Sequence, residues 1–336
     1  VAMAQEISDA PDPREMDMLL STGERISCAL MAMALHDLGH DATSFTGSQA
    51  GILTDDAHTK AKIVEIRGER LRAALDDGKI VLVAGFQGMS SNARNVTTLG
   101  RGGSDTTAVA LAASLGADVC EIYTDVTGVF TADPRVEPAA RKLAAVSHEE
   151  MLEMAAMGSK VLALRSVEFA RRHDVPLHVR SSFLPEEGTW ITKETPGMEQ
   201  AIVSGIAHRS DEAKITISGL ADRPGVAAQI FGNLADANLN VDTIIQNVGA
   251  AGGADVSFTV PLDELRPALA VIEGIRDELG YRSVSSNDAI GKVTLVGAGM
   301  KSEPGVAAKM FRVLSDEGIN LQMIDTSTIR ITVVID

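Results

Sequence analysis

The feature that most constrains the fold of this chain is a repeat in its C-terminal part. Residues 224–241 match residues 304–321, with identical side chains at nine of the 18 positions, and both copies contain the run PGVAA. Self-similarity at a fixed spacing indicates two copies of one small folding unit. Each copy has the pattern of a strand, a Pro-Gly turn, a helix and two more strands.

The first copy continues with a second amphipathic helix at residues 262–280, which gives the βαββαβ order of a ferredoxin-like domain. The second copy stops before its second helix. A stretch rich in Pro, Gly and Glu, at residues 184–200, separates this pair from the first half of the chain. We therefore expect three domains, at residues 1–195, at 199–288 with a linker strand, and at 289–336.

The first half alternates between helical and strand-like patterns. Residues 16–40 and 58–78 are predicted as amphipathic helices, and the Gly-rich residues 97–117 as a loop that enters an apolar helix. The apolar runs at residues 79–88 and 118–126 are typical of strands covered on both faces. This rhythm favours the α/β class, with a mainly parallel sheet sandwiched by helices.

The charge balance limits the partners of the chain. The net charge is −16, so the surface repels nucleic acid and anionic lipid, and an anionic ligand must be held by local basic groups. Cys28 and Cys120 both lie in apolar runs, which is typical of buried thiols in a reducing compartment. The longest apolar runs are too short to span a bilayer. We expect a cytoplasmic protein without a membrane or nucleic-acid partner.

The run TTLGRGGSDTTA at residues 97–108 is the most informative motif. Its glycines allow the backbone to approach a ligand, and Ser104 or Asp105 is placed to cap the following helix. Backbone N–H groups at a helix start attract anions, and Arg101 adds a bidentate clamp for a carboxylate or phosphate. The plainer alternative is a tight strand–helix turn. Arg, Ser and Asp in one loop favour the anion site.

Five other residues have polar groups that a ligand site would use. Thr124, Asp125 and Arg135 follow a predicted strand, where parallel sheets bind their ligands, although a solvated turn is the alternative. Glu24 lies early in a helix, where a plain capping role competes with binding. Lys160 is long enough to reach a phosphate but is otherwise an ordinary surface lysine.

Two further patterns are better explained by a structural role than by a binding or catalytic site. His36 and His40 have a spacing that zinc ligands use, but no third ligand is evident, so we predict no metal site in the protein. The basic run at residues 165–180 is typical of a solvated helix face.

Taken together, TTLGRGGSDTTA, YTDVTGVFTADPR and the repeated pair resemble the aspartate kinase family, in particular the actinobacterial type with tandem ACT domains. The resemblance implies an amino-acid-kinase domain of the carbamate-kinase-like fold, followed by two ACT domains. It implies transfer of the γ-phosphoryl group of ATP, with Mg²⁺, to the β-carboxylate of L-aspartate. The product, 4-phospho-L-aspartate, starts the diaminopimelate route to lysine, threonine and methionine.

The resemblance also implies roles for individual residues. Arg101 and Asp105 would be catalytic. The aspartate site would comprise Glu24 at the amino group, Arg101 at the α-carboxylate, and Leu75, Asp76, Gly102, Gly103 and Ser104. The ATP contacts would be Thr124, Asp125, Phe130, Thr131, Ala132, Asp133, Pro134, Arg135 and Lys160.

ACT domains pair side by side and bind amino acids, so the resemblance implies allosteric contacts in both copies. The candidates are Asp222, Ala227, Asn240, Val241, Asp242 and Gln246, with Val306, Ala307, Asn320 and Leu321 in the second copy. The alternative is that PGVAA merely starts a helix. The expected regulators are threonine and lysine. We expect threonine-linked inhibition, with the Gly/Ala-rich loop after Gln246 as a place that could weaken it. The expected assembly is a homo-oligomer, or a complex with an ACT-only subunit.

The chemistry agrees with this resemblance. A carboxylate acceptor is ionised at neutral pH, because its pKa is about 4, so it needs no general base. Catalysis then depends on bringing two anions together in line and neutralising their charge.

The chain departs from the family pattern at its ends. The family's opening strand and Gly-rich loop, with its phosphate-binding lysine, are absent, and we expect roughly 50 residues to be missing there and fewer at the other end. The chain as printed is expected to be inactive. Two alternatives stay open: another amino-acid kinase, of the glutamate or acetylglutamate type, and a non-catalytic ACT sensor subunit.

Overall fold

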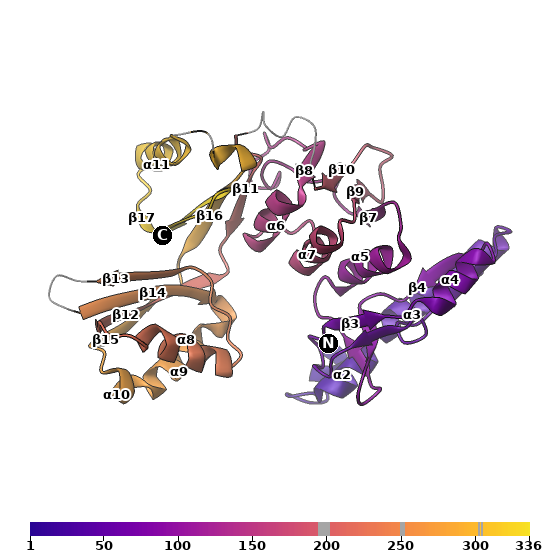
Figure 1. Ribbon diagram of the computed structural model, residues 1–336, viewed down its shortest axis with the longest axis horizontal. Coiled ribbons are helices and arrows are strands. Elements are labelled where there is room, and N and C mark those ends of the chain that lie inside the picture. The colour runs from indigo at the N-terminus through magenta and orange to yellow at the C-terminus, as the bar shows by residue number, and fades with distance from the viewer. Residues whose placement is uncertain (194–201, 249–252, 302, 304) are drawn as a thin grey trace. The chain divides into compact units, whose positions relative to one another are not determined.

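The computed structural model describes residues 1–193, 202–248, 253–301, 303 and 305–336. The chain divides into two compact units, Val1–Met198 and Glu199–Asp336 (Figure 1). The boundary positions 195 and 199 expected from the sequence lie outside the described residues.

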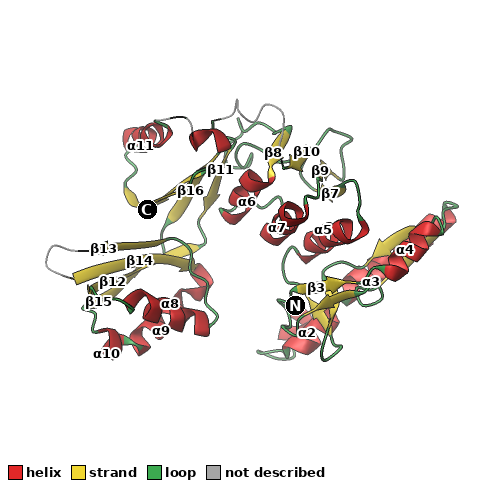
Figure 2. Ribbon diagram, in the orientation of Figure 1, coloured by secondary structure: helices red, strands yellow, loops and turns green. Residues whose placement is uncertain are grey.

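The first unit alternates helices and strands along the chain, as Figure 2 shows. Its helices are α1 (Ala2–Gln5), α2 (Pro13–Leu20), α3 (Thr22–Asp37), α4 (Glu69–Asp76), α5 (Gly103–Leu115), α6 (His148–Ala156) and α7 (Leu164–His173). Its strands are β1 (Ala42–Phe45), β2 (Ile52–Thr54), β3 (Ile63–Ile66), β4 (Ile80–Val83), β5 (Gln87–Ser90), β6 (Val96–Thr98), β7 (Cys120–Thr124), β8 (Ala145–Ser147), β9 (Leu177–Ser181) and β10 (Thr189–Thr192).

These strands form mixed sheets. The described strands pair as β1-β4, as β3-β2-β5-β6 and as β7-β9-β10-β8. Four ladders are parallel, β1/β4, β2/β5, β7/β9 and β8/β10, and β2/β3, β5/β6 and β9/β10 are antiparallel. The α/β class expected from the sequence is confirmed.

Two local expectations are wrong. Residues 58–78, predicted as one helix, contain strand β3 and the shorter helix α4, separated by Gly68 in a left-handed conformation. The run Ile63–Ile66 is β-branched at three of four positions, which suits a strand. The second expectation was that β4 and β7 are covered on both faces. Ile80 in β4 is exposed, and β7 alternates buried Cys120 and Ile122 with exposed neighbours.

The second unit contains both copies of the repeat. The first consists of β12 (Glu212–Ala221), α8 (Val226–Asp236), β13 (Ile244–Val248), β14 (Gly253–Pro261), η2 (Leu262–Glu264), α9 (Leu265–Gly274), α10 (Arg276–Leu279) and β15 (Ser283–Asn287). The second consists of β16 (Gly291–Val296), η3 (Ala298–Lys301), α11 (Val306–Asp316), β17 (Leu321–Thr326) and β18 (Arg330–Ile335). Strand β11 (Gly205–Arg209) precedes both.

Each copy builds one antiparallel sheet. The first has the order β13-β14-β12-β15, which is that of a ferredoxin-like βαββαβ domain. The second has the order β11-β16-β18-β17, so β11 occupies the place of the fourth strand. The linker strand that the sequence assigned to the range 199–288 therefore belongs to the sheet of the second copy.

A buried ammonium group joins the two copies. Lys292 of β16 is fully buried and forms an ion pair with the carboxylate of Glu212 at the start of β12. The Lys292 Nζ also lies 2.6 Å from an Asp242 carboxylate oxygen and 2.8 Å from the Thr259 hydroxyl in the first copy. Each copy has its own apolar core, centred on Phe258 and Ile230 in the first and on Met310 in the second.

Candidate functional site

The loop between β6 and α5 is a closely packed glycine turn. Gly100 and Gly102 have φ of +82° and +68°, a region that non-glycine residues rarely occupy. A Cβ atom on Gly102 would lie 2.3 Å from the Cβ of Ala163, and one on Gly103 would lie 2.9 Å from both the Leu99 Cβ and the Phe86 ring. The glycines therefore allow the loop to lie directly on the segments around Phe86 and Ala163.

The start of α5 offers unpaired backbone donors. The first helical hydrogen bond runs from the Thr106 N–H to the Gly102 carbonyl, at 3.2 Å. The N–H groups of Ser104 and Asp105 precede it and so lie outside the helix's own bonding. The expectation that Ser104 or Asp105 caps the helix is wrong. Gly102 is the N-cap residue, because its left-handed backbone begins the helix two residues earlier.

Arg101 and Asp105 lie at this helix start in different surroundings. Arg101 and Ser104 are exposed, whereas Asp105 is partly buried. Burial raises the pKa of the Asp105 carboxyl, and a hydrogen bond from the Ala163 backbone opposes that change. Burial, and then the charge of Asp105, raise the pKa of Cys120 to about 11. A guanidinium, two backbone N–H groups and a partly buried carboxylate thus lie within five consecutive residues.

The segment that contains Lys160 reaches the same loop. Lys160 is exposed between α6 and α7, three residues before Ala163. Because Ala163 touches Gly102 and bonds Asp105, the chain brings Lys160 near the start of α5.

The predicted nucleotide residues gather at the end of β7. The Thr124 hydroxyl donates to the Asp125 carboxylate at 3.0 Å. Arg135 forms two hydrogen bonds with the Asp133 carboxylate, at 3.0 Å from Nε and 2.7 Å from Nη2. Asp133, by hydrogen bond and charge, and then Asp125 hold the pKa of Arg135 above its usual value, so both acidic side chains act on the same guanidinium.

The middle of this loop is held by backbone contacts. Phe130 forms a β-bridge with Lys142, and the Thr131 N–H donates to the Arg141 carbonyl at 2.8 Å. Phe130, Thr131, Ala132 and Asp133 are partly buried, and Pro134 is exposed.

Glu24 lies in the first turn of α3 and is not part of a capping box. The Ser21 side chain makes no cap hydrogen bond, because α2 continues almost directly into α3. Gln87 of β5 holds this junction: its amide donates to the Ser21 carbonyl at 3.0 Å and accepts from Arg25 Nε at 2.9 Å. Since Gln87 pairs with Thr98 in β6, the start of α3 is tied to the strand that leads to Arg101.

Leu75 and Asp76 are not brought to this site. Both are exposed at the C-terminal end of α4. Arg72 of the same helix contacts the carbonyls of Ser114 and Leu115, at the far end of α5 from Gly103. Thirteen helical residues span about 20 Å, so we do not carry Leu75 and Asp76 into the proposed site.

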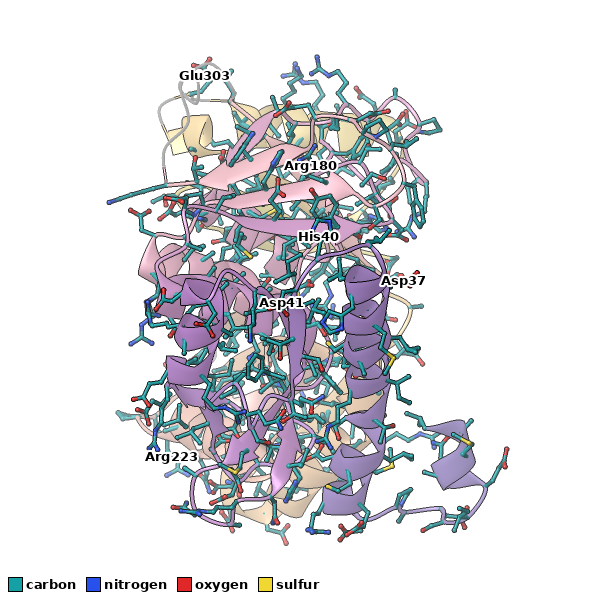
Figure 3. All side chains as sticks on the ribbon, turned by 90° about the vertical axis from the view of Figure 1, so that its right-hand side faces the viewer. Asp37, His40, Asp41, Arg180, Arg223 and Glu303 are labelled. Atoms are coloured by element: carbon teal, nitrogen blue, oxygen red, sulfur yellow. The ribbon has the colours of Figure 1, made fainter. Side chains whose placement is uncertain are left out.

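The two histidines that have a zinc-like spacing have different surroundings. The His36 Nε2 lies 2.7 Å from the Ala42 carbonyl, and His40 is exposed in the turn after α3, between Asp37 and Asp41 in sequence (Figure 3). Within the described ranges, no group of three or more His, Cys, Asp or Glu residues has the geometry to hold a metal ion.

In the part of the chain that the structure describes, one helical stretch, Pro13–Asp37, is long and apolar enough to cross a membrane by length and composition, and only 11% of its most apolar part is buried. This differs from the sequence expectation that every apolar run is too short. A single such stretch is weak evidence for a membrane. Its contacts, from Asp17 to Thr98 and from Ser21 to Gln87, are those of helices packed on a sheet.

A cavity of 480 Å³ opens at the N-terminal end of α8 in the first copy. Its walls include the predicted Asp222, Ala227 and Gln246, together with Leu220, Ala221, Arg223, Pro224, Gly225, Val226, Ala254 and Val256. Sequence reasoning missed Arg223. The signal that it left unused is a charged residue directly before the repeated Pro-Gly.

The other predicted effector residues lie outside this cavity. The Asn240 N–H donates to Glu264, Val241 packs against the first core, and Asp242 binds Lys292. In the second copy, Val306, Ala307 and Leu321 pack against the core around Met310, and Asn320 is exposed.

Comparison with known proteins agrees with both halves of this description. Residues 3–181 match the model of the amino acid kinase family, and residues 215–274 and 293–336 match that of the ACT domain. An aspartokinase of Mycolicibacterium smegmatis is 55% identical across 99% of this chain and 80% of that protein. The chain belongs to the aspartokinase family.

Other members of the aspartokinase family are similar. The aspartokinase of Corynebacterium glutamicum is 53% identical across 99% of this chain and 80% of that protein. The crystal structure of Escherichia coli aspartokinase III in complex with aspartate and ADP superposes with a TM-score of 0.83, at 30% identity. That match covers 97% of this chain and 73% of the E. coli chain.

Proposed function

We propose that this member of the aspartokinase family transfers the γ-phosphoryl group of ATP to the β-carboxylate of L-aspartate. A β-carboxylate oxygen forms a bond to the γ-phosphorus, the bond to the bridging oxygen breaks, and ADP leaves. No proton is transferred, because the acceptor is already ionised. The product, 4-phospho-L-aspartate, would begin the cytoplasmic diaminopimelate route to lysine, threonine and methionine.

The observation that carries this proposal is the glycine loop at the start of α5. It presents Arg101 and two N–H groups beside the Lys160 segment, in a chain of this family. We assign Arg101 to the α-carboxylate of aspartate and Glu24 to its ammonium group, with Gly102, Gly103 and Ser104 lining the pocket. Cationic groups and helix N-termini are the means by which proteins gather anions and stabilise the charge that develops during transfer.

ATP would be held by Thr124 and Asp125 at the end of β7, by the loop from Phe130 to Arg135, and by Lys160. Mg²⁺ in such sites is held by one or two carboxylates and by the phosphates rather than by a protein cage, which fits the partly buried Asp105 at the start of α5. When bound, the ion neutralises phosphate charge. Asp105 would also help to orient the reacting groups.

The acceptor is tested by an assay of the full-length protein. ATP and Mg²⁺ are supplied with aspartate, glutamate or N-acetylglutamate, and the acyl phosphate is trapped with hydroxylamine. We expect hydroxamate with aspartate alone. Hydroxamate with glutamate or N-acetylglutamate instead would identify another amino-acid kinase, and no product with any acceptor would favour a non-catalytic sensor.

We propose that threonine binds in the cavity beside α8. Arg223 and the N-terminus of α8 would receive its carboxylate, and Asp222 and Gln246 its ammonium and hydroxyl groups. Part of the altered loop after Gln246, residues 249–252, lies outside the described residues. We further propose that lysine acts as a second regulator and that the chains assemble through their ACT domains, with each other or with an ACT-only subunit.

This regulation is tested by measuring aspartate phosphorylation with millimolar threonine, lysine or both. We expect inhibition that Asp222→Ala and Arg223→Ala relieve. If neither amino acid changes the rate of aspartate phosphorylation, the regulatory proposal is rejected and the catalytic proposal stands.

A further inference from the structure

We propose that Asp17 is a positioning residue for the acceptor amino acid, because it holds the strand end that leads to Arg101. The inference rests on the proposed function, in which Arg101 and Glu24 bind opposite ends of aspartate. Asp17 lies in α2 and is not one of the residues assigned above to aspartate or ATP. It acts through Thr98, the last residue of β6.

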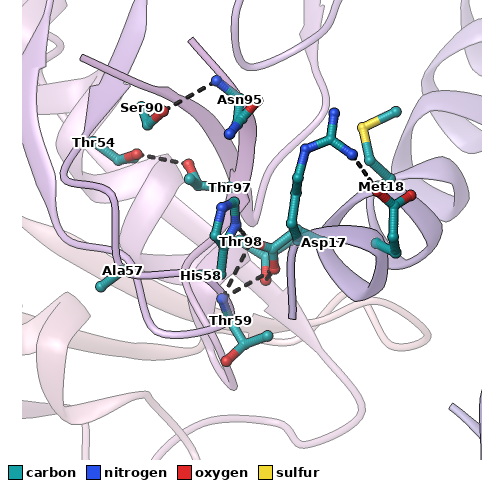
Figure 4. Close-up of polar contacts among 12 residues, drawn as sticks. Asp17, Met18, Thr54, Ala57, His58, Thr59, Ser90, Asn95, Thr97 and Thr98 are labelled. Carbon is teal, nitrogen blue, oxygen red and sulfur yellow. Dashed lines mark hydrogen bonds and ion pairs between the residues drawn. The ribbon is translucent and has the colours of Figure 1, made fainter. Parts of the chain in front are cut away.

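The Asp17 carboxylate is fully buried and its oxygens are surrounded by donors (Figure 4). Oδ1 accepts from the Thr98 hydroxyl at 2.5 Å and from the Thr59 N–H at 3.1 Å. Oδ2 lies 2.6 Å from the His58 Nδ1, which donates because a carboxylate is an acceptor. The same oxygen accepts from the Thr59 N–H at 3.2 Å.

Packing alone does not account for this group. Burial of a carboxylate carries a desolvation penalty, and an apolar side chain of similar volume is often at least as stabilising. The neighbours Met16, Met18 and Leu19 show that the helix uses apolar residues elsewhere. The carboxylate adds directional hydrogen bonds, which hold α2, the loop at His58 and Thr59, and β6 in one fixed geometry.

The residues after Thr98 are clamped on the other sides as well. The Leu99 N–H donates to the Phe86 carbonyl at 2.9 Å, and the Leu99 carbonyl accepts from Arg165 at 2.9 Å. A Cβ on Gly100 would lie 3.1 Å from the Thr59 carbonyl. Thr59 therefore touches both Asp17 and the loop, and Arg101 follows directly. The bond between Asp17 and Thr98 is the contact of this clamp that comes from helix α2.

The same carboxylate also fixes the second substrate segment. Helix α2 leads into α3, in which Glu24 lies seven residues after Asp17, or about 10 Å along a helix. The link from Asp17 to Thr98 thus sets the separation of Glu24 from Arg101. That separation decides which amino acid fits between them. The proposed nucleotide residues on β7 and its loop are outside this linkage, and Lys160 is connected to it indirectly, through Ala163 and Gly102. We therefore expect Asp17 to affect the KM for aspartate much more than the KM for ATP.

The test compares full-length Asp17→Ala, Asp17→Asn and Thr98→Val with the wild type, in assays with aspartate and with glutamate. We expect Asp17→Ala to raise the KM for aspartate by about ten-fold or more and to leave the KM for ATP within about two-fold, because displacement of a positioning group by about 1 Å costs up to about 100-fold. Preference for aspartate over glutamate should fall by a similar factor.

Thr98→Val and Asp17→Asn distinguish a positioning role from a folding defect. Thr98→Val keeps the volume and removes only the hydroxyl donor, and should reproduce the aspartate-specific change. Asp17→Asn should recover part of the affinity, since its amide oxygen can still accept from Thr98 and Thr59. Asp12→Ala is the matched control: it removes the N-cap of the same helix, whose carboxylate accepts from Arg14 and Glu15, and should lower thermal stability without changing either KM.

Equal changes in both KM values, or a fall in stability with unchanged preference for aspartate, would overturn the positioning role and leave the proposed function intact. A wild type without aspartate-dependent activity would overturn the proposed function, and this inference with it.

Discussion

At the scale of one residue, burial at the start of α5 disfavours the charged form of Asp105, a carboxylate to which we assign a catalytic role. The carboxylate is partly buried at the start of α5, where burial raises its pKa. In the unfolded chain the same group ionises near its ordinary pKa of about 4. The folded state therefore retains the proton to higher pH than the unfolded state does.

This difference fixes the pH dependence of stability. The contribution of Asp105 to folding is most favourable below the unfolded pKa and is lost as the pH rises through the folded pKa. We expect Asp105→Asn to raise the melting temperature at pH 7.5 and to lower kcat. The gain should shrink toward zero as the pH falls below about 4. A variant less stable than wild type at pH 7.5 would contradict this account; differential scanning fluorimetry across the pH range decides it.

The sequence indicated some residues of the proposed site and not others, for physical reasons. Arg101 and the glycines were predictable, because their backbone freedom and charge have one evident use in such a loop. Asp17 was not predicted: an aspartate among Met and Leu in an amphipathic helix resembles a solvated position until the tertiary fold buries it. Leu75 and Asp76 were assigned by resemblance, and their helix packs at the far end of α5.

Among the elements, α6 shows a complete local signal. Ser147 and Glu150 form a capping box: the Ser147 hydroxyl accepts from the Glu150 N–H at 3.2 Å, and the Glu150 carboxylate accepts from the Ser147 N–H at 3.2 Å. Because α6 leads into the Lys160 segment, this cap also anchors one side of the proposed nucleotide site.

We expect Ser147→Ala to lower the free energy of unfolding of the first unit by about 1 kcal/mol, the usual cost of losing a side-chain cap. Ser27→Ala is the control, because Ser27 is exposed in α3 and its hydroxyl bonds only to the preceding turn. Urea denaturation of both variants gives the comparison. Equal stability of the two would show that the cap contributes nothing.

Element boundaries were less predictable than element types. Residues 58–78 have a pattern that fits an amphipathic helix, yet the pairing of β3 with β2 converts the first part to a strand. Pairing partners lie elsewhere in the chain, and so local periodicity cannot reveal them. In the second unit, the repeat predicted both copies, but not that β11 completes the second sheet.

At the scale of the whole molecule, the two copies of the repeat are joined by a buried charge. Lys292 binds Glu212, Asp242 and Thr259, and Glu212 has a second cation in Arg209 at 3.1 Å. Removing one partner of a buried ion pair typically costs about 3–5 kcal/mol, and Arg209 should keep the loss near the lower end.

We therefore expect Lys292→Ala to destabilise the second unit by about 3 kcal/mol and to weaken any threonine response, because Asp242 is released from the joint between the copies. Lys309→Ala, which removes an exposed lysine from α11, should change neither property. Chemical denaturation and threonine titration of both variants measure the two effects. A Lys292 variant with wild-type stability would contradict the role of this joint.

With a net charge of −16, the protein as a whole repels the two anionic reactants, aspartate and ATP. The account therefore depends on local cations at the start of α5. The most direct measurement is kcat/KM for aspartate in full-length Arg101→Ala, Arg101→Lys and the surface control Arg171→Ala, which changes the net charge equally.

We predict a loss of about 100-fold or more for Arg101→Ala, partial activity for Arg101→Lys because a bidentate contact becomes a point charge, and wild-type values for Arg171→Ala. Unchanged kcat/KM for aspartate in Arg101→Ala would contradict the account.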